Sequence, residues 1–182
     1  MYTVIKRQAF TLVELLVVIS IIGLLSAVAM TSFNSTRMSA RNQKRKADLV
    51  QISKALELYY NDKGAYPSTG VSGCCSWWGV TSTFGSHDSS GSNGWIPNLA
   101  PNYIGRLPDD PNMGKINLGS ALAGCRTDAG WNTYVYTSNG TDYKLLAYCG
   151  PEGTLLPSDP FYDPTHTNSG WALFTSGASS WY

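Results

Sequence analysis

The longest apolar stretch of the chain runs from Phe10 to Phe33. Its 24 residues contain a single ionisable side chain, that of Glu14. About 20 apolar residues in a helix, at roughly 1.5 Å each, match the hydrocarbon core of a bilayer. A carboxylate inside such a segment costs roughly 2.5–3.5 kcal/mol on insertion scales. The pattern therefore predicts a membrane-spanning helix over residues 10–33 in which Glu14 has a specific role.

A second helical pattern follows over residues 34–63. Apolar residues spaced by three and four line one face of it: Leu49, Ile52, Leu56 and Tyr59. Arg41 and Arg45 extend the same face toward the N-terminus. Because a globular domain does not easily bury arginine, we expect the helix to enter the domain near Leu49 and to leave both arginines outside. Gly64 is placed to end the helix, and Pro67 prevents a restart.

The remainder, residues 64–182, has the composition of a turn-rich globular head. All nine prolines and 17 of the 18 glycines lie at or after Gly64, so the helical part ends there. Residues 132–148 predict a β-hairpin with its turn at Asn139-Gly140, and residues 171–175 predict a third strand. The expected fold class is α+β, with a small antiparallel sheet packed against the second half of the helix.

A long surface loop is predicted over residues 68–94, which are rich in Ser, Gly and Thr. Its paired tryptophans, Trp77 and Trp78, are more typical of packing anchors than of a ligand platform.

Basic residues cluster on the second helical segment: Arg37, Arg41, Lys44, Arg45 and Lys46. The favoured interpretation is a solvated face with local pairs such as Lys44 with Asp48, four residues apart. The alternatives are contact with anionic lipid or with acidic groups of neighbouring subunits, and nucleic-acid binding through phosphate. The formal net charge of the chain is only +1, but it is unevenly spread, because residues 10–63 carry seven Lys/Arg against four Asp/Glu.

The first residues resemble the start of type IV pilins and type II secretion pseudopilins. That family has a short basic leader, here residues 1–9 with Lys6 and Arg7, followed by F-T-L-[IV]-E and a long apolar helix. Residues 10–14 read FTLVE, and the small residue before them, usually Gly in the family, is Ala9. The segment ARNQKRKADLVQISKALELYYNDKGAYP and the LPDDP sequence at 107–111 also resemble pseudopilins.

The resemblance implies cleavage by prepilin peptidase between Ala9 and Phe10 and N-methylation of Phe10. It implies a pilin fold and a structural, non-enzymatic subunit that forms a homo-oligomeric filament, with Glu14 paired to the amine of a neighbouring subunit. Its partners would be membrane lipid before assembly and an assembly platform in the inner membrane, and the finished filament would be extracellular. Motility, adhesion, DNA uptake and secretion are all compatible with this interpretation.

An ordinary secretory signal is the alternative. Ala27-Val28-Ala29 is an A-x-A cleavage site, and cutting there would release a secreted adhesive or binding domain. Glu14 within the apolar region and the length of that region disfavour it.

Four cysteines, Cys74, Cys75, Cys125 and Cys149, suit an oxidising exterior. Because a bond between adjacent residues is strained, we expect Cys74 and Cys75 each to pair with Cys125 or Cys149.

Metal and catalytic chemistry find little support in the sequence. A C-x-x-C pair is absent and the histidines are only His87 and His166, which disfavours zinc. The family resemblance implies calcium near the C-terminal sheet, but no loop of this sequence matches residue by residue, so no metal or other cofactor is assigned. No nucleophile motif accompanies His87, and we expect no enzymatic activity.

Overall fold

The computed structural model describes residues 10–70, 77–114, 125 and 131–181, with the backbone only for residues 28–32. The chain consists of two compact units, residues 1–39 and residues 40–182. The described part of the first unit is helical from Leu12 onward. The second unit contains the rest of that helix and the sheet.

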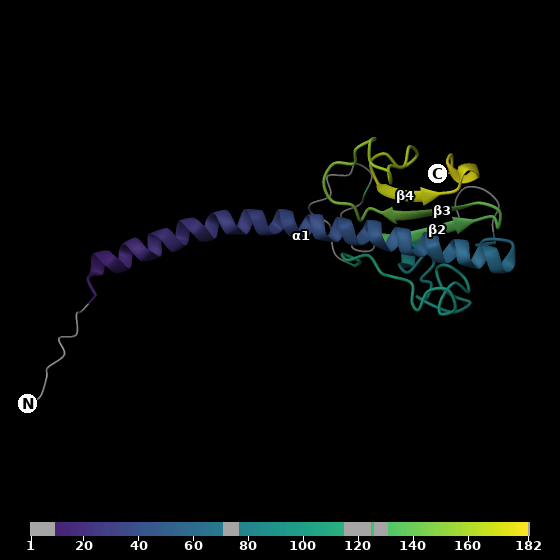
Figure 1. The fold of residues 1–182 in the computed structure, drawn as a ribbon, viewed down its shortest axis with the longest axis horizontal. Coiled ribbons are helices and arrows are strands. Elements are labelled where there is room, and N and C mark those ends of the chain that lie inside the picture. The colour runs from purple at the N-terminus through teal and green to yellow at the C-terminus, as the bar shows by residue number, and fades with distance from the viewer. Residues whose placement is uncertain (1–9, 71–76, 115–124, 126–130, 182) are drawn as a thin grey trace, which may run out of the picture. The chain divides into compact units, whose positions relative to one another are not determined.

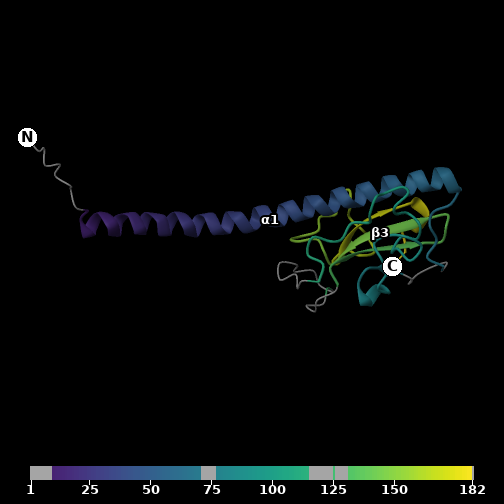
Figure 2. The ribbon, with the colours of Figure 1, turned by 90° about the horizontal axis from the view of Figure 1, so that it is seen from below.

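The helix α1 (Leu12–Lys63) is continuous over 52 residues and is the long coil in Figures 1 and 2. It ends at the predicted position. Gly64 has a φ of 75°, and its N–H donates to the carbonyl of Tyr60 at 2.7 Å. A left-handed residue directly after a helix favours glycine, so the prediction that Gly64 terminates the helix is confirmed.

A four-stranded antiparallel sheet with the order β1-β2-β3-β4 lies at the centre of the second unit. Its strands are β1 (Trp78–Gly79), β2 (Thr133–Ser138), β3 (Tyr143–Tyr148) and β4 (Gly170–Phe174). The pairing of β2 with β3 places Ser138 opposite Tyr143 across the Asn139-Gly140 turn. The predicted hairpin is therefore confirmed, and β4 confirms the third strand one residue earlier than expected.

The strand β1 is a feature that the sequence did not indicate, because it lies within the predicted loop 68–94. Trp78 pairs with Tyr136, and Gly79 pairs with Val135. A Cβ atom at Gly79 would meet the Val135 side chain at 3.1 Å and that of Phe84 at 3.0 Å. The absent side chain thus lets this short segment join the sheet edge.

One face of the sheet packs against α1, as Figures 1 and 2 show. The buried residues on the helix are Leu49, Ile52, Ala55 and Leu56, and those on the sheet include Tyr134, Tyr136, Leu145 and Ala147. Trp95, Ile96, Leu99 and Leu107 complete this core from the segment between β1 and β2. The predicted apolar helix face from Leu49 to Leu56 is confirmed, and Tyr59 packs at its margin.

The opposite face of the sheet is covered by aromatic side chains. A small second cluster comprises Val135, Leu146 and Ala172, with Trp77, Phe84, Tyr148 and Phe174 packed against it. Successive strand residues point to opposite faces, and both faces are covered, so every residue of β2 is buried. The described part of the head therefore has helix, sheet and aromatic loop layers.

The predicted cysteine pairing was wrong. Cys125 is bonded to Cys149, with their Cα atoms 5.5 Å apart, and neither pairs with Cys74 or Cys75, which lie outside the described residues. A disulfide requires two Cβ atoms within about 4 Å of each other. Here the end of β3 brings Cys149 that close to Cys125. Cys149 follows β3 with a φ of 51°, and its N–H donates to the Ser169 carbonyl at 2.6 Å.

Candidate functional site

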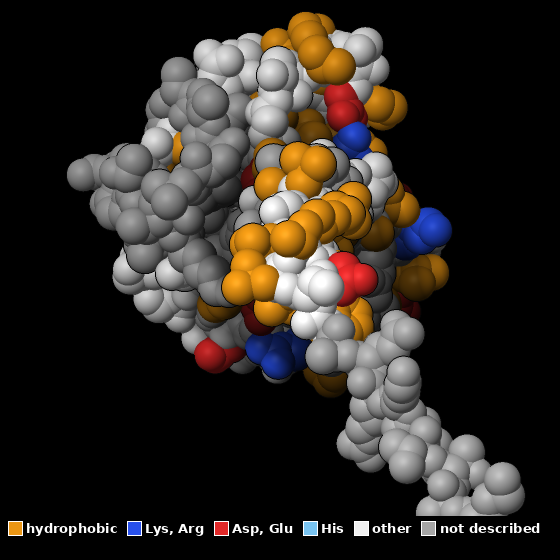
Figure 3. All heavy atoms as spheres, turned by 90° about the vertical axis from the view of Figure 1, so that its left-hand side faces the viewer, with side chains coloured by type: hydrophobic (Ala, Val, Ile, Leu, Met, Phe, Trp, Pro, Cys, Tyr) orange, Lys and Arg blue, Asp and Glu red, His pale blue; other side chains and the backbone are white. Residues whose placement is uncertain are grey.

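The first unit presents a long apolar surface to its surroundings. Every apolar side chain described between residues 10 and 25 that is larger than alanine is exposed, with fractions from 45% for Val18 to 81% for Phe10. Figure 3 shows hydrophobic side chains, in orange, exposed on the surface that faces the viewer. The residues of this surface are Phe10, Leu12, Val13, Leu15, Leu16, Val17, Val18, Ile19, Ile21, Ile22, Leu24, Leu25 and Phe33. Large exposed apolar surfaces mark membrane or protein contacts.

No helix in the described part of the chain combines the length and the hydropathy of a membrane span.

Glu14 and Thr11 form a capping box at the start of α1. The carboxylate oxygen Oε2 of Glu14 accepts the Thr11 N–H at 2.9 Å and the Thr11 hydroxyl at 2.7 Å. In return, the Glu14 N–H donates to Thr11 Oγ1 at 3.2 Å. Two amides at the helix start are thereby satisfied. The T-x-x-E pattern at residues 11–14 would have predicted this cap, which the sequence interpretation missed.

The predicted processing and assembly positions are only partly described. Phe10 and Glu14 lie four positions apart, on either side of the helix start at Leu12, and are both exposed. Ala9, like Cys74 and Cys75, lies outside the described residues. The one other hydroxyl with a described bond in this apolar stretch is Ser20, whose Oγ donates to the carbonyl of Leu16 at 2.8 Å.

A buried ion cluster anchors α1 to the head. The guanidinium of Arg45 binds Asp110 with two bonds, Nε to Oδ2 at 2.7 Å and Nη2 to Oδ1 at 3.1 Å. Its Nη1 donates to Glu152 Oε1 at 3.1 Å and to Asn42 Oδ1 at 2.9 Å. Arg41 Nε donates to Glu152 Oε1 at 2.6 Å. The side chains of Arg45 and Asp110 are both 0% exposed.

The expectation that both arginines stay outside the domain, which the helix would enter near Leu49, was therefore wrong: Arg45 is buried and Arg41 is half-buried. Two guanidinium groups meet two carboxylates, so the charges within the cluster balance. Burial alone would raise the pKa of Glu152, but the bonds from Arg41 and Arg45 hold it below its ordinary value. A buried charge is tolerated when it is paired and hydrogen-bonded, and Arg45 meets both conditions.

The ion cluster gives a structural role to the LPDDP sequence at residues 107–111. Leu107 is fully buried in the core, and Asp110 binds Arg45 from the same short segment. Asp110 Oδ1 also accepts the Asn112 N–H at 2.7 Å, which fixes the turn after the aspartate. The turn and the ion pair together hold this loop against α1.

Two further members of the predicted basic cluster, Lys44 and Lys46, also contact carboxylates. Lys44 pairs with Asp48 at 2.8 Å, as predicted from their spacing. Lys46 pairs with Asp159, and its Nζ lies 4.4 Å from the centre of the Trp171 ring. Four of the five basic residues therefore meet carboxylates of their own chain, which leaves little positive charge for nucleic-acid phosphate.

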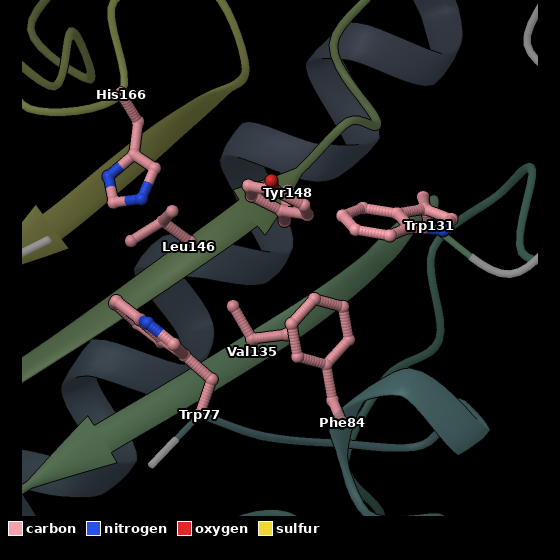
Figure 4. A pocket seen from close by; sticks show the side chains of 7 residues that line it. All are labelled: Trp77, Phe84, Trp131, Val135, Leu146, Tyr148 and His166. Atoms are coloured by element: carbon pink, nitrogen blue, oxygen red, sulfur yellow. The ribbon is translucent and has the colours of Figure 1, made fainter. Parts of the chain in front are cut away.

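An aromatic pocket of about 240 Å³ opens on the sheet face away from α1. Figure 4 shows its walls and floor, formed by Trp77, Phe84, Trp131, Val135, Leu146, Tyr148 and His166. The ring centres of Trp77 and His166 are 5.9 Å apart in a T-shaped arrangement. Trp78 instead stacks on His87, with centres 4.0 Å apart. Each ring of the Trp77-Trp78 pair therefore packs against a histidine, and the role of the pair as packing anchors stays a prediction because Trp77 also lines the pocket.

A family motif and curated relatives match the chain. The prokaryotic N-terminal methylation motif matches residues 5–30, which include Ala9, Phe10 and Glu14. Type II secretion system core protein G of Escherichia coli K12 is 33% identical over 162 residues, covering 85% of this chain and 88% of the relative. The chain belongs to the family of type II secretion system core protein G.

Other members of the family match over shorter stretches. The Klebsiella michiganensis protein is 30% identical over 113 residues, which is 62% of this chain and 73% of that relative. The Pseudomonas aeruginosa protein is 38% identical over 64 residues, 35% of this chain and 45% of that relative. No solved structure matches the chain. As a pseudopilin, the chain is a structural subunit of a pilus or pseudopilus, which confirms the resemblance found in the sequence.

Proposed function

We propose that this pseudopilin is cleaved by prepilin peptidase between Ala9 and Phe10, methylated on Phe10, and assembled into a homo-oligomeric filament through residues 10–33. The observation that supports it best is the exposed apolar surface of the first unit, with Glu14 as the sole carboxylate. Before assembly the segment lies in the inner membrane, where lipid covers it. In the filament, the same segments of neighbouring subunits replace the lipid.

Glu14 sets the register between subunits in this proposal. Cleavage before Phe10 creates a positive amine one turn from the carboxylate. A carboxylate in an apolar environment is costly alone and tolerable when it is paired. In the filament, the N-terminal ends of α1 from neighbouring subunits lie together, so the amine of one subunit binds Glu14 of another. The assembly platform in the inner membrane adds subunits one at a time, and the finished filament extends from the cell surface.

The test is the substitution Glu14→Gln. Glutamine still accepts the Thr11 N–H in a capping box, so the variant keeps the helix start and loses only the charge. We expect it to be inserted, cleaved and folded but to form few or no filaments. Glu57→Gln is the matched control, because Glu57 is an exposed carboxylate at the other end of α1 that accepts the Tyr66 hydroxyl at 3.0 Å. It should assemble normally.

Two measurements decide the outcome. Sheared surface filaments are quantified by electron microscopy and immunoblotting, and intact mass gives the N-terminus of each variant. A normal filament yield from Glu14→Gln would refute the pairing role of the carboxylate. A mature chain that starts at Met30 would refute the whole proposal and favour a secreted binding domain with an ordinary signal.

A further inference from the structure

Lys144 of β3 is enclosed by oxygen atoms in the interior of the head. Its side chain is 0% exposed. The ammonium Nζ lies 2.9 Å from Asp163 Oδ1 and 2.8 Å from Asp163 Oδ2. It also lies 2.6 Å from Thr165 Oγ1 and 2.7 Å from the carbonyl oxygen of Trp181. The single charged group thus joins the sheet, the loop at 163–165 and the end of the described chain.

The oxygens around Lys144 are themselves held in place. Asp163 Oδ1 accepts the Thr165 N–H at 3.0 Å. His166 Nδ1 lies 2.8 Å from Asp163 Oδ2 and donates to it, because a carboxylate only accepts. The carboxylate therefore has fixed partners on both oxygens besides the lysine. Such outer partners orient the ligands of a cation site in the same way.

The set of oxygens is of the kind that a hard cation takes. Carboxylate, hydroxyl and carbonyl oxygens are the usual ligands of calcium, which the family resemblance implies for this region. A calcium ion does not fit the site as it stands, because the ammonium occupies its centre and repels a second cation. The described residues, those around Lys144 included, contain no group of three or more carboxylate, histidine or cysteine side chains suited to a metal.

We propose that the ammonium of Lys144 is the built-in cation of the head and takes the place of a bound divalent ion. The head then keeps its C-terminal loops in position without calcium. Removal of the lysine side chain exposes a latent divalent-cation site made by Asp163, Thr165 and the carbonyl of Trp181. The inference concerns the head alone and does not depend on how the filament assembles.

Electrostatics agree with this arrangement. Burial alone would raise the pKa of Asp163, but bonds from His166, Lys144 and the Thr165 amide lower it to about 2. The aspartate is therefore ionised at neutral pH. Burial lowers the pKa of Lys144, and the Asp163 carboxylate opposes that shift.

The experiment follows thermal unfolding of the full chain in detergent by tryptophan fluorescence, with EDTA or with millimolar Ca²⁺. The unfolding midpoint of the unsubstituted protein should be the same in both. Lys144→Ala should unfold several degrees lower in EDTA, and Ca²⁺ should raise its midpoint. Lys144→Ala combined with Asp163→Asn should lose the response to Ca²⁺. Lys54→Ala is the matched control, since Lys54 is exposed on α1, and should behave like the unsubstituted protein.

Two results would overturn the assignment. A fall in the midpoint of the unsubstituted protein in EDTA would show that the head uses a divalent ion after all. A midpoint of Lys144→Ala that ignores Ca²⁺ would show that the oxygens do not form a cation site. If Lys144→Ala does not fold in EDTA, refolding in Ca²⁺ tests the same point, and failure to refold there counts against the proposal.

Discussion

Breaking the buried pair of Arg45 and Asp110 should be among the most destabilising single changes in the head. Asp110→Asn keeps the shape of the side chain and removes its charge. Arg45, which is 0% exposed, then faces only Glu152, a carboxylate already shared with Arg41. The remaining cluster has two cations and one anion with no access to water for Arg45.

The expected size follows from the burial of the pair. Removal of one partner from a buried ion pair costs roughly 3–5 kcal/mol, because the other charge is left uncompensated. We expect about 3 kcal/mol for Asp110→Asn, since the amide oxygen still accepts one bond from Arg45. For a unit the size of residues 40–182, that is a fall of roughly 10 °C in the unfolding midpoint.

A double-mutant cycle isolates the interaction. Arg45→Met should cost a similar amount, because it leaves Asp110 buried without its guanidinium. The double substitution should cost about 2 kcal/mol less than the sum of the single ones, since each single change strands the charge that the other removes. Urea unfolding followed by tryptophan fluorescence is suitable, because all six tryptophans lie at or after Trp77 and Trp95 is fully buried.

The neighbouring surface pair supplies the control. Arg106 and Asp109 form an ion pair at 3.2 Å in which the arginine side chain is 71% exposed. Exposed pairs contribute about 0–1 kcal/mol, so Arg106→Met and Asp109→Asn should change stability by less than that. The reasoning would be refuted if Asp110→Asn cost no more than Asp109→Asn, or if the effects of Arg45→Met and Asp110→Asn simply added.

Three further changes test the head. Gly150→Ala should lower the unfolding midpoint by several degrees, because the added Cβ would lie on the Asp110 carboxylate and 2.9 Å from Arg45 Nε; Gly105→Ala, with open space around it, should not. Reduction of the Cys125–Cys149 disulfide, with a sequence separation of 24, should cost about 3–4 kcal/mol in urea unfolding, and an unchanged urea midpoint would argue against it. The pKa of Asp163 is 3.8 in the unfolded chain and about 2 in the folded protein. The ionised carboxylate therefore adds about 2 kcal/mol to the free energy of unfolding above about pH 4, and this stabilisation is lost as the pH falls toward 2. Acid titration of stability should show this loss, and Asp163→Asn should show less of it.

Local sequence features determined much of this protein. The capping box at Thr11 and Glu14, the helix end at Gly64 and the hairpin turn at Asn139-Gly140 depend on residues within a few positions of one another. The helix period likewise indicated that Leu49, Ile52 and Leu56 of α1 face a core. The apolar segment with its one carboxylate, next to a basic leader, was sufficient to indicate the pseudopilin family.

The tertiary structure alone decided where the buried charges go. Arg45 and Asp110 are 65 positions apart, and Arg45 and Glu152 are 107 apart, so no local pattern links them. Arginine is usually exposed, and only the arrival of two carboxylates from distant loops makes its burial favourable. The same holds for Lys144, whose oxygen partners come from the loop at 163–165 and from Trp181. The pairing of Cys125 with Cys149 was likewise decided by the end of β3, because a disulfide requires a distance between Cβ atoms that the order of cysteines in the chain does not contain.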